Sequence, residues 1–159
     1  TRLAGAYSRS VKERVRFFTP HDESDCLRAI AAAHVVLDPF PASGFLSSLQ
    51  ALAVGVPVVT FPSERMAGRL TLALYDMMDY RELVVTSAAA FSTLALELAH
   101  QARLRARVVR EILERRPRLF DTRAAVADWK EFIRKATAKA SLMGARGSPE
   151  GLSSEPGPG

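Results

Sequence analysis

The sequence predicts an α/β fold, with a parallel sheet flanked by helices, followed by a helical C-terminal segment and a tail. Short apolar runs rich in β-branched residues alternate with segments of helical periodicity as far as residue 85. The links between them are short, which is typical of right-handed βαβ units and of a parallel sheet. With 159 residues, 48% of them hydrophobic, the chain is long enough to bury a sizeable core.

Four strands are expected, at residues 14–18, 34–38, 56–61 and 82–85. The run 56–61, VPVVTF, does not alternate between apolar and polar residues, which indicates a strand buried on both faces. Helices are expected between the strands, at residues 24–34, 47–55 and 63–78. Ser24 is the expected N-cap of the first of these helices, and Gly55 is expected to end the second.

From Ser87 onward the pattern is only helical, with breaks expected near Gln101 and Pro117 and a last helix at residues 121–140. The last sixteen residues hold five of the nine glycines and three of the nine prolines. Such a segment buries too little apolar area to offset its ordering entropy. We therefore expect one folded domain over residues 1–140 and a disordered Gly/Pro/Ser-rich tail over residues 141–159.

The net charge of +5 is concentrated in residues 103–118, RLRARVVREILERRPR. Apolar residues fall at helical spacing between the arginines, which predicts an amphipathic helix with a solvated arginine face. An arginine helix that binds nucleic acid is the alternative, and it is not favoured because no RNA-binding motif accompanies the helix. The arginines of this stretch are Arg103, Arg105, Arg107, Arg110, Arg115, Arg116 and Arg118.

The loop 38–47 leaves the carboxyl end of the expected strand 34–38 and leads into a helix. In parallel sheets ligands bind at this edge, and a helix N-terminus offers unpaired N–H groups to a phosphate. The loop has neither a Walker sequence nor the three glycines of a dinucleotide fingerprint. Two interpretations therefore stay open, a phosphate site and a structural turn that needs Gly44. Asp38 is expected to hold the loop by hydrogen bonds rather than to act as a base.

The motifs LDPFPASG, SLQALAVGVPVVTFPSERMAGRL and RPRLFDTRAAVADWKEFIRKA resemble the C-terminal catalytic half of the O-GlcNAc transferase family, which includes the plant SPINDLY proteins. The similarity spans about residues 14–136. It implies the C-terminal half of a GT-B fold, with a Rossmann-like domain that binds a nucleotide sugar. It also implies inverting, metal-independent transfer of a sugar to Ser or Thr hydroxyls of proteins. The donor would be UDP-GlcNAc or another nucleotide sugar such as GDP-fucose, and no further cofactor is implied.

The resemblance also implies which residues bind the nucleotide sugar. No metal ligand is implied, and the catalytic histidine is expected in an N-terminal half that this chain lacks. Some positions depart from the family pattern: Glu23 and Cys26 stand where a lysine and a histidine are usual, Phe45 and Leu46 replace threonines, and Gln50 replaces a carboxylate. The implied contacts are Gly44, Phe45, Leu46, Ser47, Ser48 and Gln50, with His21 and Cys26 as further candidates.

Two functions remain at this stage. The first is the donor-nucleotide part of a glycosyltransferase, inactive as this fragment alone and dependent on a missing half for its protein acceptor. The second is a non-catalytic module that binds nucleotide sugars or proteins. The family adds an expectation of tetratricopeptide repeats upstream. The single cysteine suits a reducing compartment, and no apolar run is long enough to span a membrane, so we expect a soluble cytoplasmic or nuclear protein.

Overall fold

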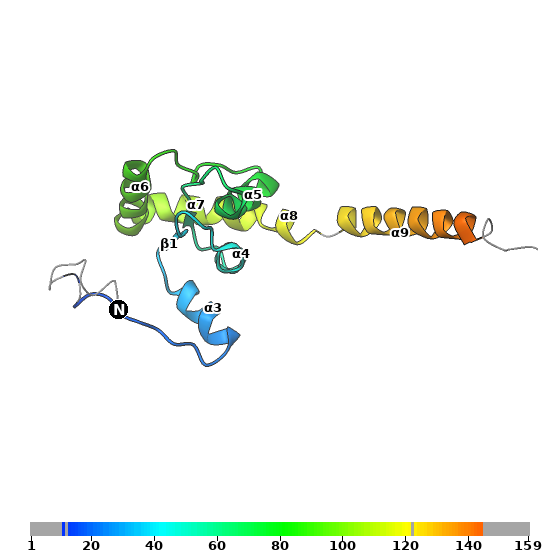
Figure 1. Ribbon diagram of the computed structural model, residues 1–159. Coiled ribbons are helices and arrows are strands. Elements are labelled where there is room, and N and C mark those ends of the chain that lie inside the picture. Colours follow the sequence, from blue (N-terminus) through cyan, green and yellow to red (C-terminus); the bar gives the residue numbers. More distant parts are fainter. Residues whose placement is uncertain (1–10, 12, 122, 145–159) are drawn as a thin grey trace, which may run out of the picture. The chain divides into compact units, whose positions relative to one another are not determined.

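The computed structural model describes residues 11, 13–121 and 123–144, without the side chains of residues 124 and 140–144 (Figure 1). The chain divides into two compact units, residues 1–119 and 120–159, and each is described by itself. The tail expected to be disordered lies outside the described residues from 145 onward, as do residues 1–10.

A small parallel sheet forms the centre of the first unit. Strand β1 (Val36–Leu37) pairs with β2 (Val58–Val59), with Val36 opposite Val58 and Leu37 opposite Val59. A parallel bridge between Thr60 and Val84 extends the sheet on the far side of β2. The expected parallel sheet is thus confirmed, although its strands are shorter than the apolar runs that predict them.

The strand predicted at residues 14–18 is wrong. Residues 15–18 have no regular secondary structure, and the side chains of Val15 and Phe17 are 42% and 78% exposed. High β-propensity reflects how well a side chain fits a pleated, half-buried surface, so a strand forms only where a partner strand and a core face receive it.

Helices α3 (Glu23–Ala31) and α4 (Phe45–Ala53) each have one end that the local sequence explains. Helix α3 is capped by Asp22, whose carboxylate accepts a hydrogen bond from the Asp25 N–H at 2.8 Å, so the expected cap at Ser24 is wrong. Helix α4 ends before Gly55, as predicted. Gly55 has a φ of +84°, a conformation that glycine adopts without steric cost.

The single helix predicted at residues 63–78 is divided in two. A 3₁₀ turn, η1 (Met66–Gly68), precedes helix α5 (Leu70–Met78). The Gly68 carbonyl accepts a hydrogen bond from the Ser63 N–H at 3.2 Å, which closes residues 63–68 into a turn of their own. At Gly68 a side chain would meet the Pro41 carbonyl oxygen at 2.3 Å, so this turn packs closely on the loop that follows β1.

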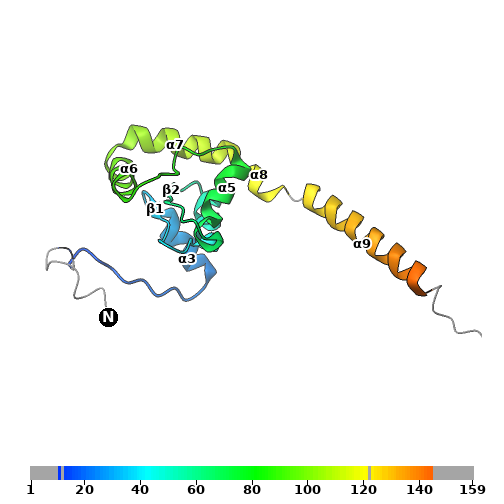
Figure 2. The ribbon, with the colours of Figure 1, turned by 45° about the horizontal axis from the view of Figure 1, so that its top comes forward.

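The helices after Ser87 follow the prediction. Helices α6 (Ala88–His100) and α7 (Ala102–Arg115) are separated at Gln101, and the short α8 (Pro117–Phe120) begins at Pro117. In Figure 2 the two strands lie among α5, α6 and α7. The core between these elements includes Leu52, Val58, Val59, Tyr75, Leu83, Leu98 and Ile112, all fully buried.

Most of the described part of the second unit is the helix α9 (Arg123–Gly144). It begins two residues after the start expected from the sequence and continues four residues beyond residue 140. Its Trp129 and Phe132 rings meet edge to face, with centroids 5.8 Å apart, and both side chains are exposed. No described helix is long and apolar enough to cross a membrane.

Candidate functional site

The loop after β1 is held from within by a buried carboxylate. Asp38 is 5% exposed and accepts hydrogen bonds from the Gly44 N–H at 2.8 Å and from the Ser43 hydroxyl at 3.0 Å. The Thr60 hydroxyl, at the end of β2, donates to the same carboxylate at 2.7 Å. The predicted role of Asp38 as the residue that holds the loop is therefore confirmed.

Helix α4 begins at this loop and presents its first amides without partners. Its N-cap, Gly44, has no side chain to cap the helix. Within the part of the chain that the structure describes, the N–H groups of Phe45, Leu46 and Ser47 make no hydrogen bond, and Ser48 is the first residue of α4 bonded to a carbonyl, that of Gly44. Such amides lie at the positive end of the helix dipole, so this group of three can bind an anion.

The side chains predicted to contact the ligand around these amides fall into two groups. Phe45 and Leu46 are exposed, and the exposed Ser47 hydroxyl donates to the Gly44 carbonyl at 2.8 Å. The Ser48 hydroxyl is buried and lies 2.8 Å from Thr71 Oγ1, so it faces the interior of the fold. The structure thus offers backbone amides and the Ser47 side chain at this surface, with Ser48 acting as part of the support.

Gln50 lies one turn further along α4 and contacts α3. Its Nε2 donates to Glu23 Oε1 at 3.4 Å. The two residues that depart from the family pattern at these positions are therefore partners, and a carboxylate lies beside α4. Of the two further candidates, His21 is exposed, with its backbone N–H donating to the Asp25 carboxylate at 3.0 Å, and Cys26 is half-buried on α3.

Thr71 of α5 and Thr60 at the end of β2 support the site, although neither was among the residues predicted for it. The Thr71 N–H donates to Ser43 Oγ at 3.0 Å, and Thr71 Oγ1 lies 2.7 Å from the same atom. Thr60 and Thr71 are buried. A polar residue within an apolar strand or helix, as in VVT at the end of β2, was the available signal, because a buried hydroxyl needs a hydrogen-bond partner.

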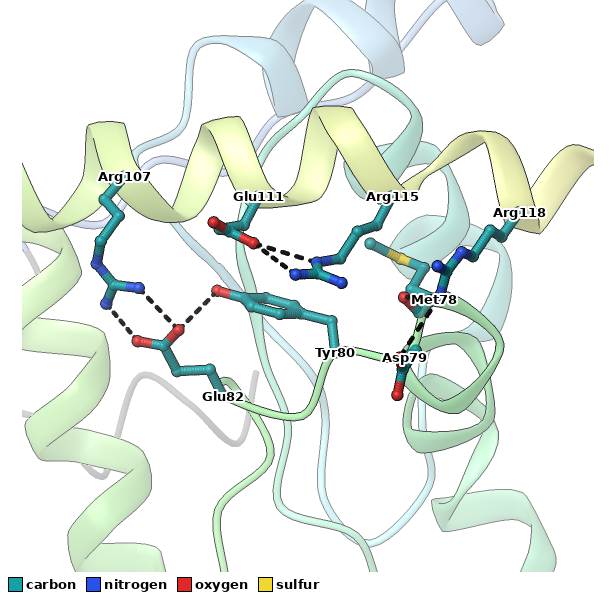
Figure 3. Close-up of polar contacts among 8 residues, drawn as sticks. All are labelled: Met78, Asp79, Tyr80, Glu82, Arg107, Glu111, Arg115 and Arg118. Carbon is teal, nitrogen blue, oxygen red and sulfur yellow. Dashed lines mark hydrogen bonds and ion pairs between the residues drawn. The ribbon is translucent and has the colours of Figure 1, made fainter.

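The arginine-rich stretch forms the predicted amphipathic helix, α7, which buries Val108 and Ile112, and none of its arginines is buried. Five of its seven arginines contact other groups of the first unit, and Figure 3 shows three of them: Arg107 with Glu82, Arg115 with Glu111, and Arg118 with Asp79. The other two donate to carbonyls: Arg105 to those of Leu98 and Ala99, and Arg116 to that of Ala53. The Arg115–Glu111 pair lies within α7, whereas the other contacts join α7 and α8 to neighbouring elements of the unit.

Tyr80 lies at the centre of this cluster (Figure 3). Its hydroxyl donates to Glu82 Oε2 at 3.2 Å, and the Arg115 guanidinium lies over its ring, 5.7 Å from the centroid. Burial raises the pKa of the Tyr80 hydroxyl above its usual value. The hydrogen bonds from Arg107 lower the pKa of the Glu82 carboxyl. The cluster stabilises the fold and is separate from the start of α4.

Among the described residues, no group of three or more His, Cys, Asp or Glu side chains is placed to hold a metal ion. The arrangement at α4 instead resembles a site for an anion bound by backbone amides, at the carboxyl edge of a parallel sheet. Its chemistry suits the diphosphate of a nucleotide sugar.

Comparisons with known proteins agree with this arrangement. A solved structure of a point mutant of the O-GlcNAc transferase of Thermobaculum terrenum is 30% identical, with a TM-score of 0.69. That match covers 77% of this chain and 24% of the other, so the chain spans about a quarter of its length, and it confirms the predicted GT-B-like fold class. No curated protein matches. A family model, glycosyl transferase family 41, matches residues 7–129. The chain therefore belongs to glycosyltransferase family 41.

Proposed function

We propose that this chain is the donor-nucleotide-binding part of a glycosyltransferase that transfers N-acetylglucosamine from UDP-GlcNAc to Ser or Thr hydroxyls of proteins. The observation that carries the proposal is the group of unpartnered amides of Phe45, Leu46 and Ser47, next to the carboxyl end of β1. A diphosphate bound there accepts hydrogen bonds from groups that the fold itself leaves unused. The same N–H groups stabilise the charge that develops on the departing diphosphate, without a metal ion.

The reaction needs more than this chain supplies. The solved O-GlcNAc transferase that it resembles is about four times as long as the matched part. We place the catalytic base and the protein-acceptor groove in the remainder of the whole protein, with tetratricopeptide repeats further upstream, and we place that protein in the cytoplasm or nucleus. The 159-residue chain alone should therefore bind a nucleotide but transfer no sugar to a Ser/Thr peptide.

A non-catalytic nucleotide-sugar-binding module is the second candidate, and the Gln50–Glu23 contact favours it. The Glu23 carboxylate lies beside α4 and would repel a diphosphate bound at the helix start. If this repulsion weakens donor binding, Glu23→Gln should tighten the binding of UDP. The two candidates are separated by supplying UDP-GlcNAc and a Ser/Thr peptide to the whole protein, since only the transferase produces a glycosylated peptide.

Two substitutions at one position test the amide site. Phe45→Pro removes an N–H that folding does not use, at the first position of a helix, where proline is accepted. Phe45→Ala is the matched control, because it shortens the same side chain and keeps the N–H. We expect Phe45→Pro to lose one hydrogen bond to a charged group relative to Phe45→Ala, about 1.5–3 kcal/mol of UDP binding energy measured by calorimetry. Equal UDP affinities in the two folded variants would contradict the proposed site.

A further inference from the structure

The N-termini of α4 and α5 are tied together by one side chain. Ser43 Oγ donates to the Asp38 carboxylate at 3.0 Å and accepts a hydrogen bond from the Thr71 N–H at 3.0 Å. Thr71 is the second residue of α5, whose own N-cap, Arg69, makes no side-chain hydrogen bond to the helix. Ser43 therefore caps α5 from a position 28 residues upstream, while Asp38 also holds the Gly44 N–H at the start of α4.

We infer that Asp38, acting through Ser43, is the positioning residue of the amide site and makes the direction of the α4 amides depend on α5. The inference rests on the proposed function for the identity of the ligand, a nucleoside diphosphate. Helix α4 has no side-chain cap of its own, so the hydrogen bond from Gly44 to Asp38 holds this end of the helix to the sheet. Because an anion is bound well only by amides of fixed direction, whatever moves the Asp38 carboxylate moves the site.

The surroundings of Asp38 make the link stiff. The carboxylate is 5% exposed, and the fully buried Thr60 hydroxyl attaches it to the end of β2 at 2.7 Å. The Ser43 N–H also donates to the Ala67 carbonyl at 2.8 Å, just before α5. Buried hydrogen bonds of this kind are strengthened by the low local dielectric and by the exclusion of water. The sheet end, the start of α4 and the start of α5 therefore form one rigid unit.

The link can be cut without touching the α4 backbone. Ser43→Ala removes the cap on α5 and its connection to Asp38, and leaves the bond between Asp38 and Gly44 in place. Ser43→Thr keeps the hydroxyl and is the conservative rescue. Tyr75→Phe is the matched control, because it removes two buried hydrogen bonds of α5, both to the Val58 backbone and neither to Ser43 or Asp38.

For each variant of the 159-residue chain we would measure amide hydrogen exchange and the affinity for UDP. The informative amides are the first in each helix that donate to a backbone carbonyl, Ser48 in α4 and Ala73 in α5. We expect Ser43→Ala to speed exchange at both amides about fivefold and to weaken UDP binding by a similar factor, the equivalent of one hydrogen bond. Ser43→Thr should restore both readouts, and Tyr75→Phe should leave UDP affinity unchanged.

Faster exchange at Ala73 alone, with Ser48 unchanged, would overturn the inference, because the two helix starts would then be independent. Unchanged UDP affinity in Ser43→Ala would overturn it as well, while the proposed function would stand. If the unaltered chain binds no UDP, the proposed function fails, and exchange at Ser48 still decides whether Asp38 and Ser43 couple the two helices.

Discussion

The hydroxyl of Tyr75 substitutes for a missing strand, and its removal gives a quantitative test of the packing. Tyr75 is fully buried on α5, and its hydroxyl donates to the Val58 carbonyl at 2.6 Å and accepts from the Val58 N–H at 3.2 Å. Both Val58 groups point away from β1, on the side where Thr60 pairs with residues 83 and 85. At the level of Val58 no described strand lies on that side, so a side chain supplies the partner.

Tyr75→Phe keeps the ring and leaves both backbone groups of Val58 without a partner in the core. An unsatisfied buried donor or acceptor costs about 1–3 kcal/mol, and the two groups together should lower the free energy of unfolding by about 3 kcal/mol. For a domain of this size that corresponds to a fall of roughly 10 °C in the melting temperature. Urea denaturation followed by circular dichroism measures the change.

Tyr80→Phe is the matched control for this prediction. The Tyr80 hydroxyl donates to a carboxylate that is itself 42% exposed in its side chain, so water can replace the lost partner. Removing this hydroxyl should lower the free energy of unfolding by less than about 1 kcal/mol. If the two variants lose the same stability, the Tyr75 hydroxyl does not substitute for a strand and the reasoning is refuted.

Three further predictions concern backbone strain and pH. Gly55→Ala should lower the free energy of unfolding by about 2 kcal/mol, because φ is +84° and the new Cβ would lie 2.7 Å from Leu113 Cδ2. In a double-mutant cycle measured by urea denaturation, adding Leu113→Ala should remove the steric contact and so recover only that part of the loss. Arg107 lowers the pKa of Glu82, so the stability that this ion pair adds is present above the ordinary pKa of about 4.5 and is lost as the pH falls below it. Glu82→Gln should remove this acid dependence of the free energy of unfolding, which at an exposed pair amounts to under about 1 kcal/mol between pH 6 and pH 3. Burial raises the pKa of Tyr80 above 10, so the stability that its protonated hydroxyl adds is complete below pH 10 and is lost at higher pH. Tyr80→Phe should reduce the loss of stability that circular dichroism measures between pH 9 and pH 11.5. An unchanged alkaline profile would argue against the burial of this hydroxyl.

Much of the local structure could be predicted because its signals are local. Gly55 ends a helix because the left-handed conformation there suits a residue without a side chain. The separation of α6 from α7 at Gln101 and the start of α8 at Pro117 follow from interruptions in a single helical pattern. The prediction that Asp38 holds its loop also rests on near neighbours, since Ser43 and Gly44 lie five and six residues away.

The candidate site was predicted only in part. The position of the loop at the carboxyl end of a strand indicated the α4 amides correctly as unpartnered groups. The direction of the Ser48 hydroxyl, the contact of Gln50 with Glu23 and the support from Thr71 join residues that are 23 to 28 positions apart. No periodicity or cap signal carries such pairings, and the binding roles of Gly44 to Gln50 stay predictions.

The sequence by itself therefore determined where several helices end, the parallel arrangement of the strands and the loop that carries the amides, because these depend on residues a few positions apart. Only the tertiary structure decided which buried groups pair with one another. The arginines of α7 and α8 show the difference: the sequence predicts a solvated face, and none of them is buried, but only the fold decides which carboxylates and helix-end carbonyls they contact. Residues 14–18 are the converse case: their sequence favours a strand, but among the described residues no partner strand pairs with them. A backbone preference is set within one turn or strand, whereas a side-chain partner is set by the packing of elements that are distant in the chain.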